Sequence, residues 1–194
     1  GLAAHLRAER VDVLVDATHP FAARMRWHAA AAADEVGIPR LRVERPAWHP
    51  VNGDRWVSVT DLDAAAHAVT AGGYARAFLS TGRTELAPFA RCVGVWFLVR
   101  SVEPPDPLPL AAAEVVLARG PFTVDGELAL LHHHRIDAVV TKNSGADATA
   151  AKLTAARELG LPVVMVERPA SPPGPLVTSV DEALAWFAEV TAPT

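Results

Sequence analysis

The chain of 194 residues has very few cysteines and lysines: a single cysteine, Cys92, and two lysines, Lys142 and Lys152. One cysteine excludes an internal disulfide framework and is typical of a reducing compartment. No apolar run approaches the roughly 18–20 residues of a membrane span, and the N-terminus lacks the charged-then-apolar pattern of a secretory signal. We therefore expect a cytoplasmic protein without a membrane partner.

A basic surplus is also lacking, because 18 Lys and Arg residues stand against 22 Asp and Glu residues, for a net charge of −4. Without a global positive field, a nucleic-acid partner is not expected. Hydrophobic residues make up 51% of the chain and charged residues 21%. This composition supports a folded core and excludes global disorder.

Short β-branched runs alternate with alanine-rich stretches along the whole chain, which predicts an α/β fold with a mostly parallel sheet. A segment with four prolines, residues 103–109, can only be a connection. The expected strands are residues 11–16, 41–44, 56–59, 77–80, 95–100, 114–118, 138–141 and 163–167. The expected helices are residues 22–36, 62–71, 86–91, 126–135, 148–159 and 181–190.

Two segments of the chain are similar to one another. Residues 37–46 read GIPRLRVERP and residues 160–169 read GLPVVMVERP, with six identities in ten; upstream, residues 11–20 align with 136–145. A helix–Gly–x–Pro–strand corner alone looks alike in unrelated proteins. The Glu-Arg-Pro continuation and the matching strand before it favour two similar α/β halves. We place their boundary between residues 72 and 73.

Four loops that follow predicted strands carry candidate functional residues, and parallel sheets bind ligands at these carboxyl ends. In the loop 16–21, His19 can hydrogen-bond or protonate a ligand. The alternative is a structural role alone, in which Thr18 or His19 caps the next helix. In the loop 80–84, Gly82 permits a turn with positive φ, and Arg83 offers a planar fork for an anion.

The other two loops also carry cations. Arg119 precedes Gly-Pro at a strand end, where it binds a ligand or simply covers a turn. Lys142 lies in the loop 141–145 before a helix, a common place for an anion site, although the Gly-Lys-Ser order of a Walker A loop is absent. Three of the four loops therefore carry Arg83, Arg119 or Lys142. In a chain of negative net charge, this concentration predicts a small polyanionic ligand.

The run His132-His133-His134 does not predict a metal site. Consecutive residues of a helix point about 100° apart and cannot converge on one ion, so a solvated helix end is the expected reading and no metal is assigned. Glu127 is likewise expected at a solvated helix position, and Cys92 is expected to be inert.

Several short motifs, taken in order, resemble the precorrin-6A reductase family: VDATHPFA (15–22), TGRTEL (81–86), ARGPF (118–122), VTKNSG (140–145) and AAKLTAARELGLPVVMVERP (150–169). The resemblance implies two Rossmann-like halves with a ligand cleft between them, and NADPH-dependent reduction of one double bond of precorrin-6A, giving precorrin-6B in cobalamin biosynthesis. Members of the family begin with a strand and a Gly-Gly-Thr-type turn. This chain starts after those elements, so its N-terminal half is expected to be truncated.

The resemblance also implies roles for the loop residues. The NADPH site would be lined near its nicotinamide end by residues of the first loop, with either His19 or water as the proton donor. The acid-rich tetrapyrrole substrate would be held by the other three loops. The cofactor-site residues are Asp16, Thr18, His19, Pro20 and Phe21. The substrate-site residues are Thr81, Gly82, Arg83, Arg119, Lys142, Ser144 and Gly145.

Three other functions are compatible with a two-half architecture and a cationic rim. A lyase of the uroporphyrinogen-III synthase type would clamp a tetrapyrrole without a nicotinamide. A non-catalytic tetrapyrrole carrier would bind without turnover. A dinucleotide-binding regulatory domain would bind NADPH without a corrinoid.

Overall fold

Parallel strand pairing characterises the computed structural model, which describes residues 1–192. Every strand pair in this part of the chain is parallel. The pairs form a three-stranded sheet in the order β1-β2-β9 and a six-stranded sheet in the order β3-β8-β7-β4-β5-β6. The α/β class with two parallel-sheet halves is therefore confirmed.

The chain divides into two compact units, but not at the expected boundary. Unit 1 consists of Gly1–Ala47 together with the segment from Pro169 onward, and unit 2 is Trp48–Arg168. The expected boundary between residues 72 and 73 instead falls inside unit 2. The reason is that β3 (Arg55–Val59) pairs with β8 (Pro162–Val166), so it belongs to the second sheet despite following the first in sequence.

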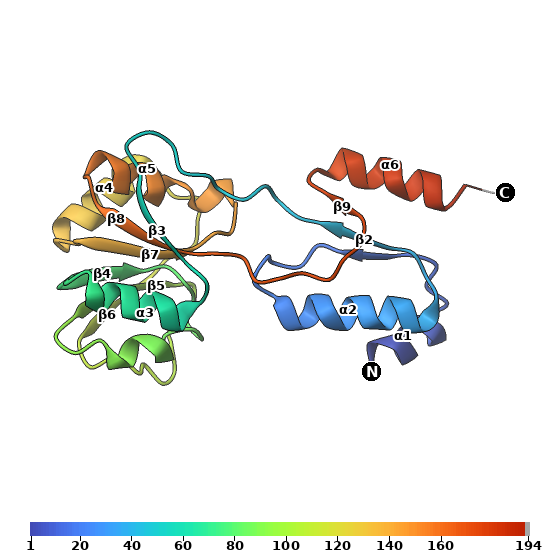
Figure 1. Cartoon of the computed structure of the whole chain (residues 1–194), viewed down its shortest axis with the longest axis horizontal. Coiled ribbons are helices and arrows are strands. Elements are labelled where there is room, and N and C mark those ends of the chain that lie inside the picture. The colour runs from blue at the N-terminus through green and yellow to red at the C-terminus, as the bar shows by residue number, and fades with distance from the viewer. Residues whose placement is uncertain (193–194) are drawn as a thin grey trace. The chain divides into compact units, whose positions relative to one another are not determined.

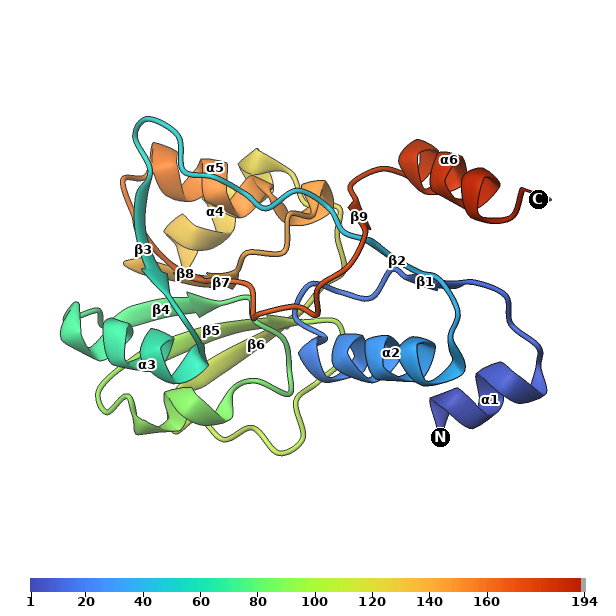
Figure 2. The same ribbon diagram turned by 45° about the vertical axis from the view of Figure 1, so that its right-hand side comes forward.

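Unit 1 is built on the small sheet, with α2 and α6 on its opposite faces (Figures 1 and 2). As predicted, α2 ends at Gly37, which takes a left-handed φ of 78°. Ser179 and Glu182 form a capping box at the start of α6. The elements of unit 1 are α1 (Leu2–Ala8), β1 (Leu14–Asp16), α2 (Ala23–Val36), β2 (Arg40–Val43), β9 (Leu176–Val177) and α6 (Val180–Val190).

Unit 2 is a three-layer arrangement in which α4 and α5 pack together and α3 packs with η1. Right-handed crossovers place these two groups on opposite faces of the sheet, because the chain moves across it in opposite directions. Besides β3 and β8, its elements are α3 (Leu62–Ala71), β4 (Arg76–Leu79), η1 (Ala87–Arg91), β5 (Trp96–Ser101), β6 (Ala113–Leu117), α4 (Val124–His133), β7 (Ala138–Lys142), η2 (Asp147–Thr149) and α5 (Ala151–Glu158).

The core of unit 2 lies between the sheet and the α4–α5 pair. Phe78, Leu98 and Val139 of the sheet are fully buried there against Leu131 and Leu153 of the helices. These positions explain why the central strands read as continuous apolar runs rather than as alternating ones. Among the described residues, no helix combines the length and the apolar character needed to cross a bilayer.

The internal repeat corresponds to one repeated βαβ element, β1–α2–β2 in unit 1 and β7–α5–β8 in unit 2. Leu14 pairs with Arg40, and at the aligned positions Val139 pairs with Val163. The two strand pairs therefore share one register, which confirms that the loops 16–21 and 141–145 hold equivalent positions.

Candidate functional site

The strand order of unit 2 creates a topological switch point between β4 and β7. From β4 the chain proceeds to β5 and β6 on one side, then returns to β7 and β8 on the other. Ligands of open parallel sheets bind outside the carboxyl ends of the strands at such a point. The predicted loops 80–84 and 141–145 follow these two strands, so the fold brings them side by side.

The loop after β4 combines a buried hydroxyl with an exposed cation. Thr81 is only 3% exposed, and its Oγ1 has no hydrogen-bond partner within the described structure. Gly82 takes a φ of 115°, a conformation that favours glycine. Arg83 is about half exposed and pairs with Glu103 at 2.8 Å. The loop thus offers a hydroxyl and a guanidinium at the switch point.

Lys142, at the end of β7, reaches across to the neighbouring loop. Its Nζ lies 2.5 Å from Oε2 of Glu85, and the two side chains are 16% and 29% exposed. This ion pair joins the two loops that flank the switch point. Sequence reasoning identified Lys142 but did not identify Glu85 as its partner.

Asn143 anchors the loop after β7, a role that the sequence analysis missed. Its side chain accepts the backbone N–H of Trp48 at 2.8 Å and donates to the carbonyl of the same residue at 3.0 Å. Gly145 takes a left-handed φ of 68°. Ser144, the predicted ligand between them, is partly exposed and accepts the N–H of Ala146. Asn143 thereby holds the loop while Ser144 stays accessible.

The loop after β6 carries Arg119, which is exposed. A side chain at Gly120 would place its Cβ 2.8 Å from the carbonyl oxygen of Ala148, so glycine is required there. That same carbonyl accepts the N–H of Phe122 at 3.1 Å, which ties this loop to η2. Because β5 lies between β4 and β6, Arg119 follows a strand about 10 Å from the one that precedes Arg83.

Three buried charged residues, Arg100, Glu127 and Lys152, form a cluster in unit 2. Glu127 of α4 is 2% exposed and pairs through both carboxylate oxygens with Arg100 of β5, whose guanidinium lies 3.7 Å from the ring of Phe122. The expectation that Glu127 lies at a solvated position is therefore wrong. Its inward position neutralises Arg100, because without the Glu127 carboxylate the guanidinium would be buried with no counter-charge from α4.

Lys152, on the first turn of α5, completes the cluster. It is 3% exposed, and its Nζ donates to the carbonyl of Thr149 at 2.6 Å. Burial, together with the nearby positive charge of Arg100, lowers the pKa of the Lys152 ammonium to about 7, although the Glu127 carboxylate opposes the shift. The sequence signal for this burial is the spacing of Lys152 with Ala155 and Ala156, an apolar helix face.

In unit 1, the loop after β1 is organised by Asp16. One carboxylate oxygen accepts both the N–H and the hydroxyl of Thr18, at 3.0 and 2.7 Å. The other oxygen, Oδ2, is buried and has no hydrogen-bond partner within the described structure. His19 is exposed, and its Nδ1 accepts the N–H of Phe21 at 3.2 Å. Pro20 is buried beside them.

The helix that follows this loop carries a buried cation in its first turn. Arg26 is 1% exposed and lies 2.8 Å from Glu44, while its guanidinium also donates to Ser171 at 2.9 Å. Glu44 in turn lies 3.4 Å from Arg42. The N-cap position of α2, Ala22, makes no side-chain capping bond. The first N–H groups of α2 therefore receive no side-chain cap from Ala22.

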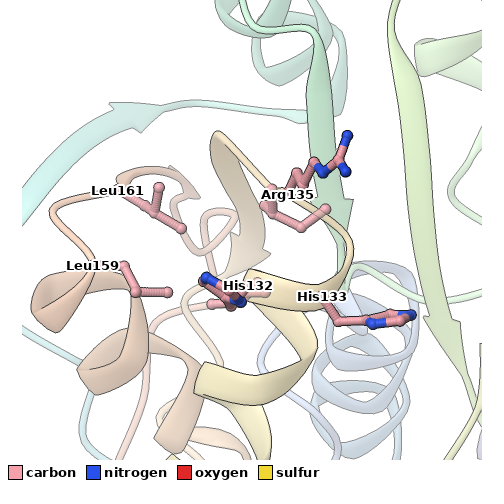
Figure 3. Close-up of a pocket in the computed structure, with 7 residues that line it drawn as sticks. His132, His133, Arg135, Leu159 and Leu161 are labelled. Atoms are coloured by element: carbon pink, nitrogen blue, oxygen red, sulfur yellow. The ribbon is translucent and has the colours of Figure 1, made fainter.

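A pocket of about 500 Å³ lies at the opposite edge of unit 2, between the ends of α4 and α5 (Figure 3). Leu159 and Leu161 line it together with His132 and His133, whose side chains point away from one another. His133 and His134 lie closer together, because their ring centroids are 4.7 Å apart. His132 and His133 are exposed, as expected of a solvated helix end, whereas the side chain of His134 is 12% exposed and stacks on Trp96. The pocket lies near the amino ends of β7 and β8, away from the switch-point loops.

These observations define a class of protein. Both units are Rossmann-like α/β units, and the one that contains the switch point presents cations there. The model of the family described as "Precorrin-6x reductase CbiJ/CobK" matches residues 1–188, so the chain belongs to the precorrin-6x reductase family.

Individual relatives agree with this assignment. The chain is 47% identical over 192 residues to a precorrin-6A reductase of Rhodococcus erythropolis, covering 98% of the chain and 77% of the relative. It is 31% identical over 185 residues to a cobalt-precorrin-6A reductase of Priestia megaterium, covering 90% and 72%. A solved structure titled CobK precorrin-6A reductase matches with a TM-score of 0.92 and 43% identity, over 98% of this chain and 76% of that one. The predicted resemblance is confirmed.

Proposed function

We propose that the chain is an NADPH-dependent reductase that transfers a hydride to one double bond of precorrin-6A, giving precorrin-6B. The observation that carries the proposal is the pair of polar loops at the β4/β7 switch point, in a member of a reductase family. The cobalt-free substrate is favoured because identity is higher to the relative named precorrin-6A reductase than to the one named for cobalt-precorrin-6A.

The substrate side of the proposal rests on charge. Precorrin-6A carries several carboxylates, and a carboxylate binds well to guanidinium, ammonium and hydroxyl donors. Lys142, Arg83 and Thr81 would hold acid groups at the switch point, with Ser144 and Gly145 beside Lys142. Arg119 would hold a more distant acid group of the same ring, because it follows a strand two positions from β4. Gly82 would let the ligand approach the backbone.

The cofactor side of the proposal rests on unit 1. Oδ2 of Asp16, which has no hydrogen-bond partner among the described residues, is a buried acceptor that suits an amide N–H, such as that of a nicotinamide carboxamide. The uncapped start of α2 offers N–H donors that suit a phosphate. Thr18, Pro20 and Phe21 would line the same site. When bound, NADPH supplies the hydride.

His19 is proposed to deliver the proton that accompanies hydride transfer. It is exposed at the end of β1, and its Nδ1 accepts a backbone N–H, which leaves Nε2 as the nitrogen that carries a transferable proton. In this arrangement the imidazole is held in one orientation by its own loop.

The test is turnover of precorrin-6A with NADPH, followed by the loss of NADPH absorbance and by product mass. Lys142→Met should raise KM at least about tenfold, because a partly buried cation that pairs with the ligand is lost. Arg91→Met is the matched control, since Arg91 is a surface cation in η1, which leads to the amino end of β5. Tetrapyrrole binding without NADPH oxidation would contradict the proposal and favour a carrier or a lyase.

A further inference from the structure

We propose that Glu85 is a specificity-determining residue that occupies the position of a substrate carboxylate on Lys142 and gives way when the substrate binds. The inference rests on the proposed function, because it takes Lys142 to be a substrate ligand. It adds a residue that the family motifs and the sequence analysis leave without a role.

The geometry of the Glu85 loop supports this exchange. The N–H of Glu85 bonds to the carbonyl of Gly82 at 3.3 Å, so the chain turns back on itself after β4. Its carboxylate then lies over Gly82, where an added Cβ would sit 3.7 Å from Oε2. The carboxylate therefore reaches Lys142 across the same turn that presents Thr81 and Arg83.

The burial of the pair explains why a carboxylate is needed there. Lys142 is the less exposed partner, at 16% against 29% for Glu85. A largely buried ammonium is costly to leave without a counter-charge, whereas the more exposed Glu85 can turn towards water. A ligand carboxylate would replace Glu85 with little change in the charge around Lys142. A neutral ligand would not replace the carboxylate that Glu85 supplies to Lys142, so the exchange selects for acids.

A second ion pair in the same region provides a matched comparison. Arg83 pairs with Glu103 at 2.8 Å, but these side chains are 48% and 63% exposed. Solvent screening makes such a pair weak. Removing Glu103 should therefore change ligand binding much less than removing Glu85.

The experiment measures binding of uroporphyrin, an acid-rich tetrapyrrole, to the full chain by fluorescence titration. Variants Glu85→Gln, Glu103→Gln, Lys142→Met and the double variant Glu85→Gln/Lys142→Met are compared, and thermal unfolding checks that each is folded. Glu85→Gln keeps the size of the side chain and removes its charge. It should tighten binding about fivefold, and Glu103→Gln should change binding less than about twofold. In the Lys142→Met background, Glu85→Gln should have no such effect.

Each outcome separates this inference from the proposed function. If Lys142→Met weakens binding but Glu85→Gln leaves it unchanged or weakens it, the exchange role of Glu85 is wrong and the substrate assignment of Lys142 stands. If Lys142→Met does not weaken binding, both the assignment of Lys142 and the exchange role fail. Equal tightening by Glu85→Gln and Glu103→Gln would indicate a general charge effect and overturn the specific role.

Discussion

The repeated βαβ elements of the two units share a backbone register but treat a buried cation differently. In unit 1, Arg26 lies in the first turn of α2 and is neutralised by Glu44, which follows β2. In unit 2, Lys152 begins α5, yet Glu167, the repeat equivalent of Glu44, forms no ion pair with it in the described structure. The Glu127 carboxylate, whose charge acts on Lys152, is bound to Arg100 instead. Sequence similarity between repeats therefore predicts backbone geometry better than it predicts electrostatic contacts.

Among these variants, Glu127→Gln should lower the free energy of unfolding most. It would leave Arg100 and Lys152 buried without their shared carboxylate, and we expect a loss of about 4 kcal/mol in the free energy of unfolding. Urea denaturation measures it. Adding Lys152→Met to this variant should recover at least about 1 kcal/mol, because one of the two uncompensated cations is removed. A loss below about 1 kcal/mol would show that the pair carries little stability.

The comparison between the repeats is tested directly by Glu44→Gln and Glu167→Gln. Glu44 neutralises Arg26 and lies near Arg42, so its replacement should cost about 3 kcal/mol. Glu167 is only partly buried and forms no ion pair within residues 1–192, so its replacement should cost less than about 0.5 kcal/mol. Urea denaturation of both variants gives the difference, and equal losses would mean that the two glutamates act alike after all.

The buried Lys152 of unit 2 also predicts that the free energy of unfolding depends on pH. Since the pKa of Lys152 falls to about 7 from 10.5, the unfolded chain binds more protons than the folded chain between these values. Stability from this group therefore rises with pH from about 7 to 10.5, by at most about 1.4 kcal/mol per pH unit. Below pH 7 the full cost of burying the charge is present.

Lys152→Met removes this contribution. The difference in unfolding free energy between the wild type and Lys152→Met should change steadily in favour of the wild type from pH 7 to pH 9. Arg91→Met, a surface change, should keep a constant difference over the same range. A flat difference for Lys152→Met would rule out a lowered pKa.

Surface ion pairs should matter least in either unit. Arg7 and Glu35 of unit 1 pair at 2.9 Å but are 52% and 60% exposed. Arg7→Met should change the unfolding free energy by less than about 0.5 kcal/mol, because solvent screens the pair. Thermal unfolding at low and high salt checks this, and a salt-sensitive loss above about 1 kcal/mol would contradict it.

Most helices and strands were predictable because their signals are local. The helix end at Gly37 and the apolar runs of β7 and β8 need no tertiary information. Two elements were missed: α1, a helix of only seven residues, and β9, a two-residue strand after a proline-rich loop. Neither has a periodic pattern long enough to detect. The sheet membership of β3 was also missed, because pairing with a strand a hundred residues away leaves no local trace.

In the candidate site, too, local features were predictable and tertiary contacts were not. The loops were predictable because carboxyl ends of parallel strands carry ligand sites, and the repeat identified two equivalent ends. The ion-pair partners of the charged residues were not predictable, because the contacts of Lys142 with Glu85 and of Glu127 with Arg100 join positions far apart in sequence. Glu127 was misjudged because a glutamate on a helix is usually solvated, and only tertiary packing reverses that preference.

The pairing of β2 with β9 imposes an order on folding during synthesis. All strands of the six-stranded sheet lie between residues 55 and 166, whereas the smaller sheet needs residues 176 and 177. As the nascent chain leaves the ribosome, unit 2 can complete its sheet before β9 has been synthesised. Until then, β2 lacks the strand that pairs with its outer edge. The unit that begins first in translation is thus the one that finishes last.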